Sequence, residues 1–271
     1  MNTLQFVGLP LSGKSLLLTN IKKNSKRFVN SKILIINFLY QKKKINIFEY
    51  LYWSYLFSRT DNVKYETNKR IKKNKHKIRF KIFIYNLFLP SYNNILKKIF
   101  TSLPRYEAKY LQLFNHLNYL SKKYNADLSK VIQTIKIDII AYEISKNEKK
   151  YFLLNSESIY QRALSILFRI PTIDSRDLKI YLDLCPRIDR VFIIINKNIK
   201  KNNLIDYIRI INPEFFFNDE IIKKIFFIFK YLHKNKFVKN IIYFKNLDDN
   251  SIKLAVKSIN DDENNTYRIW R

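Results

Sequence analysis

Glycine is nearly missing from this chain, which has only Gly8 and Gly13 among its 271 residues. Glycine adopts positive φ without a Cβ clash and lets another group approach the backbone closely. A sequence that avoids glycine elsewhere is expected to keep it where the backbone needs one of these properties. The segment around these two positions is therefore the first candidate for a functional site.

Cysteine and long apolar runs are also scarce. Cys185 is the only cysteine, which excludes an intramolecular disulfide and a cysteine-based zinc site, and the 3 histidines are scattered. The apolar run Ile225–Phe229 is far shorter than the roughly 20 residues that span a bilayer. No charged leader with an apolar signal core precedes the first motif. We expect a cytoplasmic protein with no membrane span.

Acidic residues are outnumbered by basic ones, 22 to 51, which gives a formal net charge of +29. Such a field attracts nucleotides, nucleic acids and acidic membranes. Lys, Asn, Ile, Phe and Tyr are also the residues that an AT-rich coding sequence favours, so a merely solvated basic surface is the simpler interpretation. The apolar fraction of 47% supplies enough material for a core.

The segment from Gly8 to Ser15 reads GLPLSGKS and matches the phosphate-loop pattern G-x-x-x-x-G-K-S/T. In this pattern backbone amides and a helix N-terminus surround an anion, the lysine reaches the β and γ phosphates, and the hydroxyl holds Mg²⁺. A turn that merely caps a helix would need neither the second glycine nor Lys14. We expect ATP to be bound by Gly8, Leu9, Pro10, Leu11, Ser12, Gly13, Lys14, Ser15 and Leu16.

Alternating strands and helices are expected around this loop. The expected strands are Thr3–Val7, Lys32–Phe38, Tyr151–Asn155, Asp177–Leu184 and Ile241–Phe244, while Val191–Ile195 fits a strand or a helix. The expected helices start at Leu16 and cover Glu157–Arg169, Ile199–Ile211, Asp219–His233 and about Asn250–Ser258. This order predicts an α/β fold, a three-layer P-loop NTPase sandwich with a parallel sheet of about five strands.

A large insertion interrupts the alternation. Residues from about 40 to 147 are mostly aromatic and aliphatic at helical spacing with lysines between them, which predicts a basic helical insertion in a single domain covering residues 1–271. Within it, Lys69–Lys81 is the densest positive run, and His76 is one more polar residue there. This run is either a guide for an anionic substrate or nucleic acid, or, as the simpler interpretation, a solvated loop.

The stretch LLNSESIYQRALSILF at Leu153–Phe168 resembles the D-E-G-x-x-Q-R segment of thymidylate-kinase-like nucleoside triphosphate-binding proteins. Glu157, Gln161 and Arg162 match this segment, whereas Ser156 and Ser158 stand where it has Asp and Gly. The following IPTIDSRDLKIYLDLCP is similar to the segment of that family that carries a short Y-L-D. The resemblance implies that Glu157 binds Mg²⁺ or the acceptor and that Arg162 neutralises the transferring phosphate, beside Lys14 as the third catalytic residue.

The roles of several other charged residues remain open at this point. Asp183 would end the expected fourth strand, as a water-mediated Mg²⁺ ligand or as a surface aspartate that caps the strand. Four arginines are candidates for phosphate contacts, namely Arg162, Arg169, Arg187 and Arg190. The run VFIIINKN also resembles the guanine-reading N-K-x-D motif, but its aspartate is missing, because Asn198 is followed by Ile199.

The expected function is ATP-dependent transfer of a γ-phosphoryl group to a small acceptor, a nucleoside, a nucleotide or a sugar-like alcohol. In this hypothesis the insertion supplies the acceptor pocket. The alternative is a non-catalytic nucleotide-binding protein or an ATPase that holds nucleic acid on its basic insertion. The net charge and the absence of an acidic residue at Ser156 favour this alternative.

Overall fold

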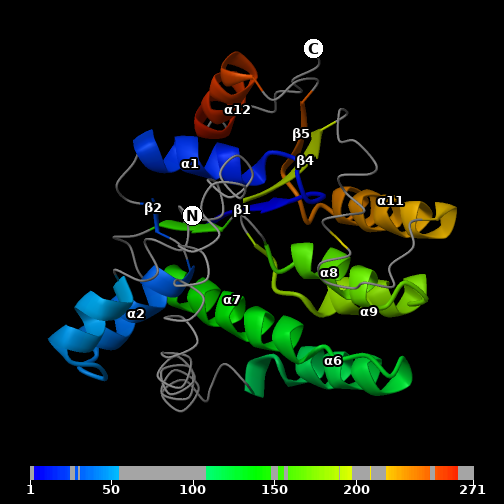
Figure 1. The fold of residues 1–271 in the computed structure, drawn as a ribbon, viewed down its shortest axis with the longest axis horizontal. Coiled ribbons are helices and arrows are strands. Elements are labelled where there is room, and N and C mark those ends of the chain that lie inside the picture. Colours follow the sequence, from blue (N-terminus) through cyan, green and yellow to red (C-terminus); the bar gives the residue numbers. More distant parts are fainter. Residues whose placement is uncertain are drawn as a thin grey trace, which may run out of the picture. The chain divides into compact units, whose positions relative to one another are not determined.

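The fold was analysed in a computed structural model, which describes residues 3–24, 28–29, 31–54, 108–147, 152–155, 158–188, 190–196, 208, 218–244 and 248–261. The chain divides into two compact units. One unit comprises Met1–Ser31 and Tyr110–Arg271, and we call it the sheet unit; the other comprises Lys32–Lys109, and we call it the inserted unit. Figure 1 shows the described elements coloured along the chain.

The sheet unit contains a parallel sheet, which confirms the expected α/β class. Its strand order is β2-β3-β1-β4-β5. The strands are β1 (Thr3–Val7), β2 (Phe28–Val29), β3 (Phe152–Asn155), β4 (Val191–Asn196) and β5 (Asn240–Phe244). In the register, Gln5 of β1 lies opposite Asn155 of β3 and Val191 of β4. All residues of β1 are buried, as expected for a central strand covered on both faces.

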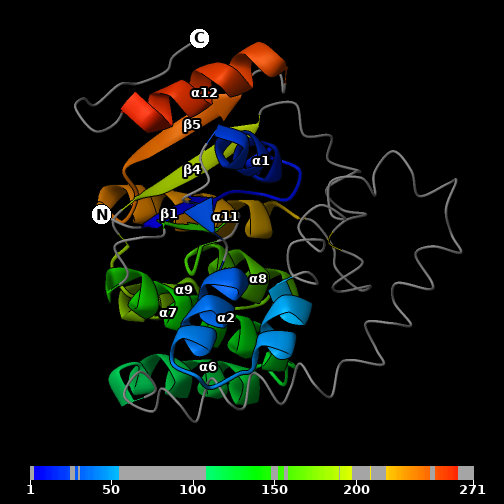
Figure 2. The same ribbon diagram turned by 90° about the vertical axis from the view of Figure 1, so that its left-hand side faces the viewer.

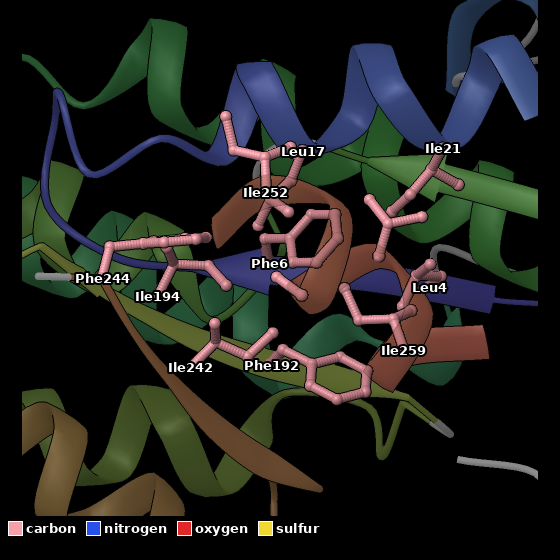
Figure 3. Close-up of a cluster of buried hydrophobic side chains, with 12 residues drawn as sticks. Leu4, Phe6, Leu17, Ile21, Phe192, Ile194, Ile242, Phe244, Ile252 and Ile259 are labelled. Atoms are coloured by element: carbon pink, nitrogen blue, oxygen red, sulfur yellow. The ribbon is translucent and has the colours of Figure 1, made fainter. Parts of the chain in front are cut away.

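Two helices cover one face of the sheet, α1 (Lys14–Asn24) and α12 (Asp249–Asp261). Both views, Figures 1 and 2, show them on the same side. Figure 3 shows the apolar cluster beneath them, which includes Leu4 and Phe6 of β1 and Leu17 of α1. Leu4 and Phe6 share a face because side chains alternate along a strand. This cluster fixes the start of α1 over the end of β1.

The opposite face carries the helices α7 (Ser129–Asn147), α8 (Gln161–Arg169) and α9 (Ser175–Leu184), as Figures 1 and 2 show. Helix α7 packs against β3 and α8, and α6 (Leu111–Lys123) packs against α9. Helix α11 (Asp219–Lys234) contacts α8 and α9. Among helices of the described ranges, none combines the length and the apolar character needed to cross a bilayer.

The connections that follow β1 and β4 lead toward opposite edges of the sheet. From β1 the chain continues through α1 to β2, whereas from β4 it continues through α11 to β5 at the other edge of the sheet. Ligands of open parallel sheets bind in the crevice outside the carboxyl ends of the strands where such connections diverge. The segment that follows β1 lies at this place.

Two expected strands are wrong. Lys32–Phe38 lies in α2 (Ser31–Gln41), and Asp177–Leu184 lies in α9. Each is a short apolar run, which periodicity alone does not assign to strand or helix. In α9 the buried residues Asp177, Leu178, Tyr181 and Leu182 follow helical spacing, and the side chain of Asp174 caps the helix by accepting from the Arg176 amide.

The other expectations have mixed outcomes. The strands near residues 3, 152 and 241 and the helices that became α8, α11 and α12 are confirmed, and Val191–Ile195 is a strand. The expected helix Ile199–Ile211 lies outside the described residues except for Ile208, which is helical. Of the expected helical insertion at about 40–147, α6 and α7 belong to the sheet unit, whereas a helix at 47–54 belongs to the inserted unit. Lys69–Lys81 lies outside the described residues.

Candidate phosphate-binding site

The candidate site is the loop Gly8–Gly13, which joins β1 to α1 and which we call the phosphate loop. Because β1 lies between β3 and β4, the loop emerges among three carboxyl ends of parallel strands. Helix α1 begins directly after it, at Lys14, and has no acidic residue in its first turn. The positive end of the helix dipole therefore faces the loop without a neutralising carboxylate from α1.

Gly8 is required by the backbone of the neighbouring strand. A Cβ atom at this position would lie 2.4 Å from the carbonyl oxygen of Ile194 in β4 and 2.9 Å from Oγ of Ser12. Both distances are far below van der Waals contact, and the first involves backbone that cannot rotate away. The first of the two glycines is thus explained by close approach.

The loop also contains two residues with positive φ, Leu11 at 66° and Gly13 at 99°. Between them, the Ser12 amide donates to the Leu9 carbonyl at 3.2 Å and the Ser12 side chain is buried. Left-handed residues alternating with right-handed ones can turn successive amides toward one side, which is the backbone pattern of a concave anion-binding nest. The second glycine is explained by this conformation, and Leu11 adopts it despite its side chain.

Lys14 folds back over the loop and is 7% exposed. Its Nζ donates to the Gly8 carbonyl at 2.6 Å, to the Leu9 carbonyl at 2.7 Å and to Ser12 Oγ at 3.4 Å. The ammonium is therefore held against the loop and adds a full positive charge to the dipole of α1. An anion in the nest would meet both charges.

The first turn of α1 presents the remaining groups. The amides of Leu16 and Leu17 donate to the Gly13 carbonyl, each at 3.1 Å. The amides that precede Leu16 have no carbonyl acceptor within the helix, because a helix leaves its first amides unsatisfied internally. Ser15, the expected Mg²⁺ ligand, is exposed. Leu9 and Pro10 are partly exposed along the loop.

Gln161 contacts the loop directly. It matches the D-E-G-x-x-Q-R segment, but no role was expected for it. Its Oε1 accepts the Gly8 amide at 2.7 Å, and its side chain is buried. The two residues are 153 positions apart, so the contact could be found only through the parallel pairing of β1 and β3. The Gln-Arg pair of the resemblance was the available signal.

Of the two catalytic residues implied by the resemblance, the structure describes Arg162 but not Glu157. Glu157 lies outside the described residues, as does Ser156. Arg162 lies in α8, where Nε and Nη2 donate to Asp138 Oδ2 of α7 at 3.3 and 3.2 Å. The guanidinium is thus engaged by a buried carboxylate, and its role toward phosphate stays a prediction.

Asp183 does not end a strand, which corrects the premise for its proposed role as a metal ligand. It lies near the end of α9, and its carboxylate accepts a hydrogen bond from the Tyr231 hydroxyl of α11. This contact joins two helices of the sheet unit. Within the described ranges, His, Cys, Asp and Glu side chains form no group of three that could hold a metal ion.

The other candidate arginines make local contacts. Arg169 Nη1 donates to the Asp127 carbonyl at 3.5 Å, and Arg187 Nη1 donates to the Asn235 carbonyl at 2.8 Å. The Arg187 guanidinium also lies 3.7 Å from the centre of the Phe237 ring. Arg190 precedes β4, at the amino end of the strand, and its carbonyl accepts the Gln5 amide. Asn198 lies outside the described residues.

The residues of the loop fit a polyphosphate better than they fit a metal ion alone. The cradle has a position that no Cβ can enter, two left-handed residues, a buried ammonium and a helix N-terminus. For Mg²⁺ the first turn of α1 offers the Ser15 hydroxyl, so phosphate oxygens and water would have to complete the shell. Comparison with known proteins finds no protein-family model, no curated protein and no solved structure that matches this chain.

Proposed function

We propose that the protein binds the phosphate tail of a nucleoside triphosphate, ATP, with Mg²⁺ in the loop formed by Gly8–Ser15 together with Leu16. The observation that carries the proposal is the position of the Lys14 ammonium, 2.6 Å from the carbonyl of a glycine that cannot carry a side chain. A glycine turn that only capped α1 would need neither contact. The resemblance to nucleotide kinases is a second, independent support.

The roles of the residues follow from this geometry. The loop amides and the first turn of α1 would bind phosphate oxygens, and Lys14 would exchange its bonds to the Gly8 and Leu9 carbonyls for bonds to phosphate. Ser15 would hold Mg²⁺, which when bound neutralises charge that develops on the phosphates. Arg162 and Glu157 remain proposed partners of the transferred group and of the metal or acceptor.

The proposed reaction is transfer of the γ-phosphoryl group to a small alcohol or phosphate acceptor. Phosphoryl transfer depends mainly on positioning and charge neutralisation, so a preorganised cationic loop supplies much of what the reaction requires. The proposed acceptors are a nucleoside, a nucleotide or a sugar-like alcohol. P-loop nucleotide kinases are the class to which this reaction would assign the chain.

A different function is favoured by the charge. With a net charge of +29 and with Asn155 at the end of β3, the chain also suits a nucleotide-binding protein without catalysis or an ATPase that holds nucleic acid. Binding to nucleic acid would weaken steeply with salt, because each neutralised phosphate releases counterions. A titration of a single-stranded and a duplex oligonucleotide at several salt concentrations measures this slope directly.

The test of the leading proposal is ATP consumption with Mg²⁺ against a panel of nucleosides, nucleotides and sugars, in the wild type and in Lys14→Ala. Acceptor-stimulated turnover that Lys14→Ala abolishes supports a kinase. Tight ATP binding without turnover on any acceptor supports the alternative. Equal ATP binding by wild type and Lys14→Ala overturns both, because the loop would then not be the nucleotide site.

A further inference from the structure

The hydrogen bond between Gly8 and Gln161 joins the phosphate loop to a helix on the opposite face of the sheet. Its donor is the first amide of the loop and its acceptor is Oε1 of the first residue of α8. Both residues are buried. A buried amide without an acceptor lowers the stability of the folded state. The side chain of Gln161 therefore holds the loop where it leaves β1.

The turn before α8 fixes where this side chain lies. The Ser158 amide donates to the Phe6 carbonyl at 3.0 Å, which continues the pairing between β1 and β3 beyond Asn155. The Gln161 amide donates to the Ser158 carbonyl at 3.0 Å and lies 3.1 Å from Ser158 Oγ. The backbone of Gln161 is therefore linked to β1 through Ser158, and its side chain bonds the loop directly.

The next residue attaches the same turn to α7. Arg162 and Asp138 form an ion pair of 3.2 Å, in which the carboxylate is 7% exposed and the guanidinium 14% exposed. The other oxygen of this carboxylate accepts the Ser31 hydroxyl at 3.3 Å. Removing one partner of a buried ion pair leaves an uncompensated charge, so this pair holds the first turn of α8 against α7.

Helix α7 also holds the residues at which the chain leaves and re-enters the sheet unit. Ser31 is the last residue before the inserted unit and Tyr110 is the first after it. Ser31 bonds Asp138, and the Tyr110 hydroxyl donates to the carboxylate of Glu143, which is also buried. Two carboxylates on one helix thus bind the two residues of the sheet unit that precede and follow the inserted unit in the sequence.

We infer that Gln161 is a positioning residue of the phosphate loop and that Asp138, through Arg162, positions Gln161. The chain of contacts Gly8–Gln161–Arg162–Asp138–Ser31 then links the loop to the point where the inserted unit begins. This inference rests on the proposed function and deepens it, because it makes affinity for a polyphosphate depend on Asp138 of α7, which acts through Arg162 and Gln161 of α8.

The first experiment needs no nucleotide. Hydrogen exchange of the full chain is measured by mass spectrometry for peptides that cover residues 4–16, in wild type, Gln161→Met and Gln161→Glu. Loss of one buried hydrogen bond should speed exchange of the loop amides about tenfold in Gln161→Met. Gln161→Glu keeps an acceptor oxygen and should retain protection. Apolar packing alone would give the opposite order, with Met protected and Glu exposed, and that order overturns the inference.

The second experiment tests the link through Asp138. Asp138→Asn is compared with Asp177→Asn, a matched control that also removes a buried carboxylate from a lysine or arginine partner. We expect faster loop exchange and about tenfold weaker ATP binding in Asp138→Asn, but wild-type values of both in Asp177→Asn. Equal effects of the two substitutions would mean a general loss of stability and would overturn the link.

The two hypotheses fail in distinguishable ways. If wild type binds no ATP while Gln161→Met loosens the loop and Gln161→Glu does not, the proposed function fails and the positioning role stands. If ATP binds and requires Lys14, but the loop exchanges alike in wild type and Gln161→Met, the positioning role fails and the proposed function stands.

Discussion

The Tyr124 hydroxyl lies 2.7 Å from Oδ2 of Asp177, and the Lys123 ammonium lies 2.7 Å from the same oxygen. The Tyr124 hydroxyl also accepts the Asp174 amide at 2.9 Å. The end of α6 is thereby fastened to the start of α9, on the side of the sheet that holds α7 and α8. One buried carboxylate thus organises this junction.

Asp177 should make stability depend on pH. Burial by itself raises the pKa of this carboxyl, but the hydrogen bonds from Lys123 and Tyr124 outweigh burial and lower the pKa below its ordinary value of 3.8. A lowered pKa stabilises the fold above the ordinary value, and this contribution is lost as the pH falls through the folded value. Asp177→Asn should cost about 2 kcal/mol at pH 7.

Urea denaturation at pH 7 and at about pH 3 measures this effect. The difference in free energy of unfolding between wild type and Asp177→Asn should shrink at the lower pH. Lys123→Met, which removes the partner cation, should flatten the pH dependence of the wild type as well. A difference that stays constant across this range contradicts the assignment.

Gly8→Ala should destabilise both the fold and the loop. The added methyl group would lie 2.4 Å from the Ile194 carbonyl oxygen, so β1 and β4 must separate locally. Overpacking of this kind typically costs about 1–3 kcal/mol. Gly8→Ala should unfold at a lower urea concentration than the wild type and should bind ATP more weakly. Ser12→Ala is the control, since it removes only the 3.4 Å contact with Lys14 and should lower stability by less than about 1 kcal/mol.

Leu11→Gly should be tolerated, unlike the same change in a helix. Leu11 has φ of 66°, where a side chain is strained by roughly 1 kcal/mol, and glycine relieves this strain while adding entropy to the unfolded chain. We expect a stability within about 0.5 kcal/mol of wild type, whereas Leu254→Gly in α12 should lower it by about 1 kcal/mol. A larger loss at Leu11 than at Leu254 would show that the side chain, not the backbone, matters there.

Cys185 should be unreactive in the folded protein. Burial raises the pKa of its thiol well above the ordinary value, and Asp183 raises it further while the Tyr181 hydrogen bond opposes the shift. The thiolate is the reactive form, and reagent must also wait for local opening. An opening free energy of about 3 kcal/mol would slow alkylation by about a hundredfold relative to denatured protein. Comparable iodoacetamide rates with and without denaturant would refute the burial of this residue.

The sequence predicted helices more reliably than strands, because α8, α11 and α12 match expected helices whereas two of the five expected strands are helical. Thr3–Val7 was recognisable as a strand because a glycine loop and a helix follow it directly. Lys32–Phe38 and Asp177–Leu184 became helices because short isoleucine- and leucine-rich runs suit either structure, and tertiary packing decides between them. Asp183 was expected to end a strand because Asp177–Leu184 was predicted to be one. As a residue of α9 it contacts Tyr231 of α11 and does not lie at the carboxyl end of a strand.

The candidate site was predictable only where it is local in sequence. The loop from Gly8 to Ser15 carries its own signal in two glycines and a lysine. Asp138 carries no such signal and Gln161 carries only its match to the resemblance, because their contacts with Ser31 and Gly8 join residues 107 and 153 positions apart. Such contacts depend on strand order, which periodicity does not encode. Arg162 was noticed through a resemblance, yet its buried partner on α7 was not.

The obstacle at Gly8 is a main-chain atom, the carbonyl oxygen of Ile194, which every amino acid carries. No replacement at residue 194 can therefore act as a second-site suppressor of a larger residue at position 8. Glycine is almost absent from the rest of this chain, and at position 8 the backbone of β4 leaves no space for any other residue. A genetic screen for revertants of Gly8→Ala should return glycine codons at position 8, or substitutions elsewhere that move the β4 backbone away from it.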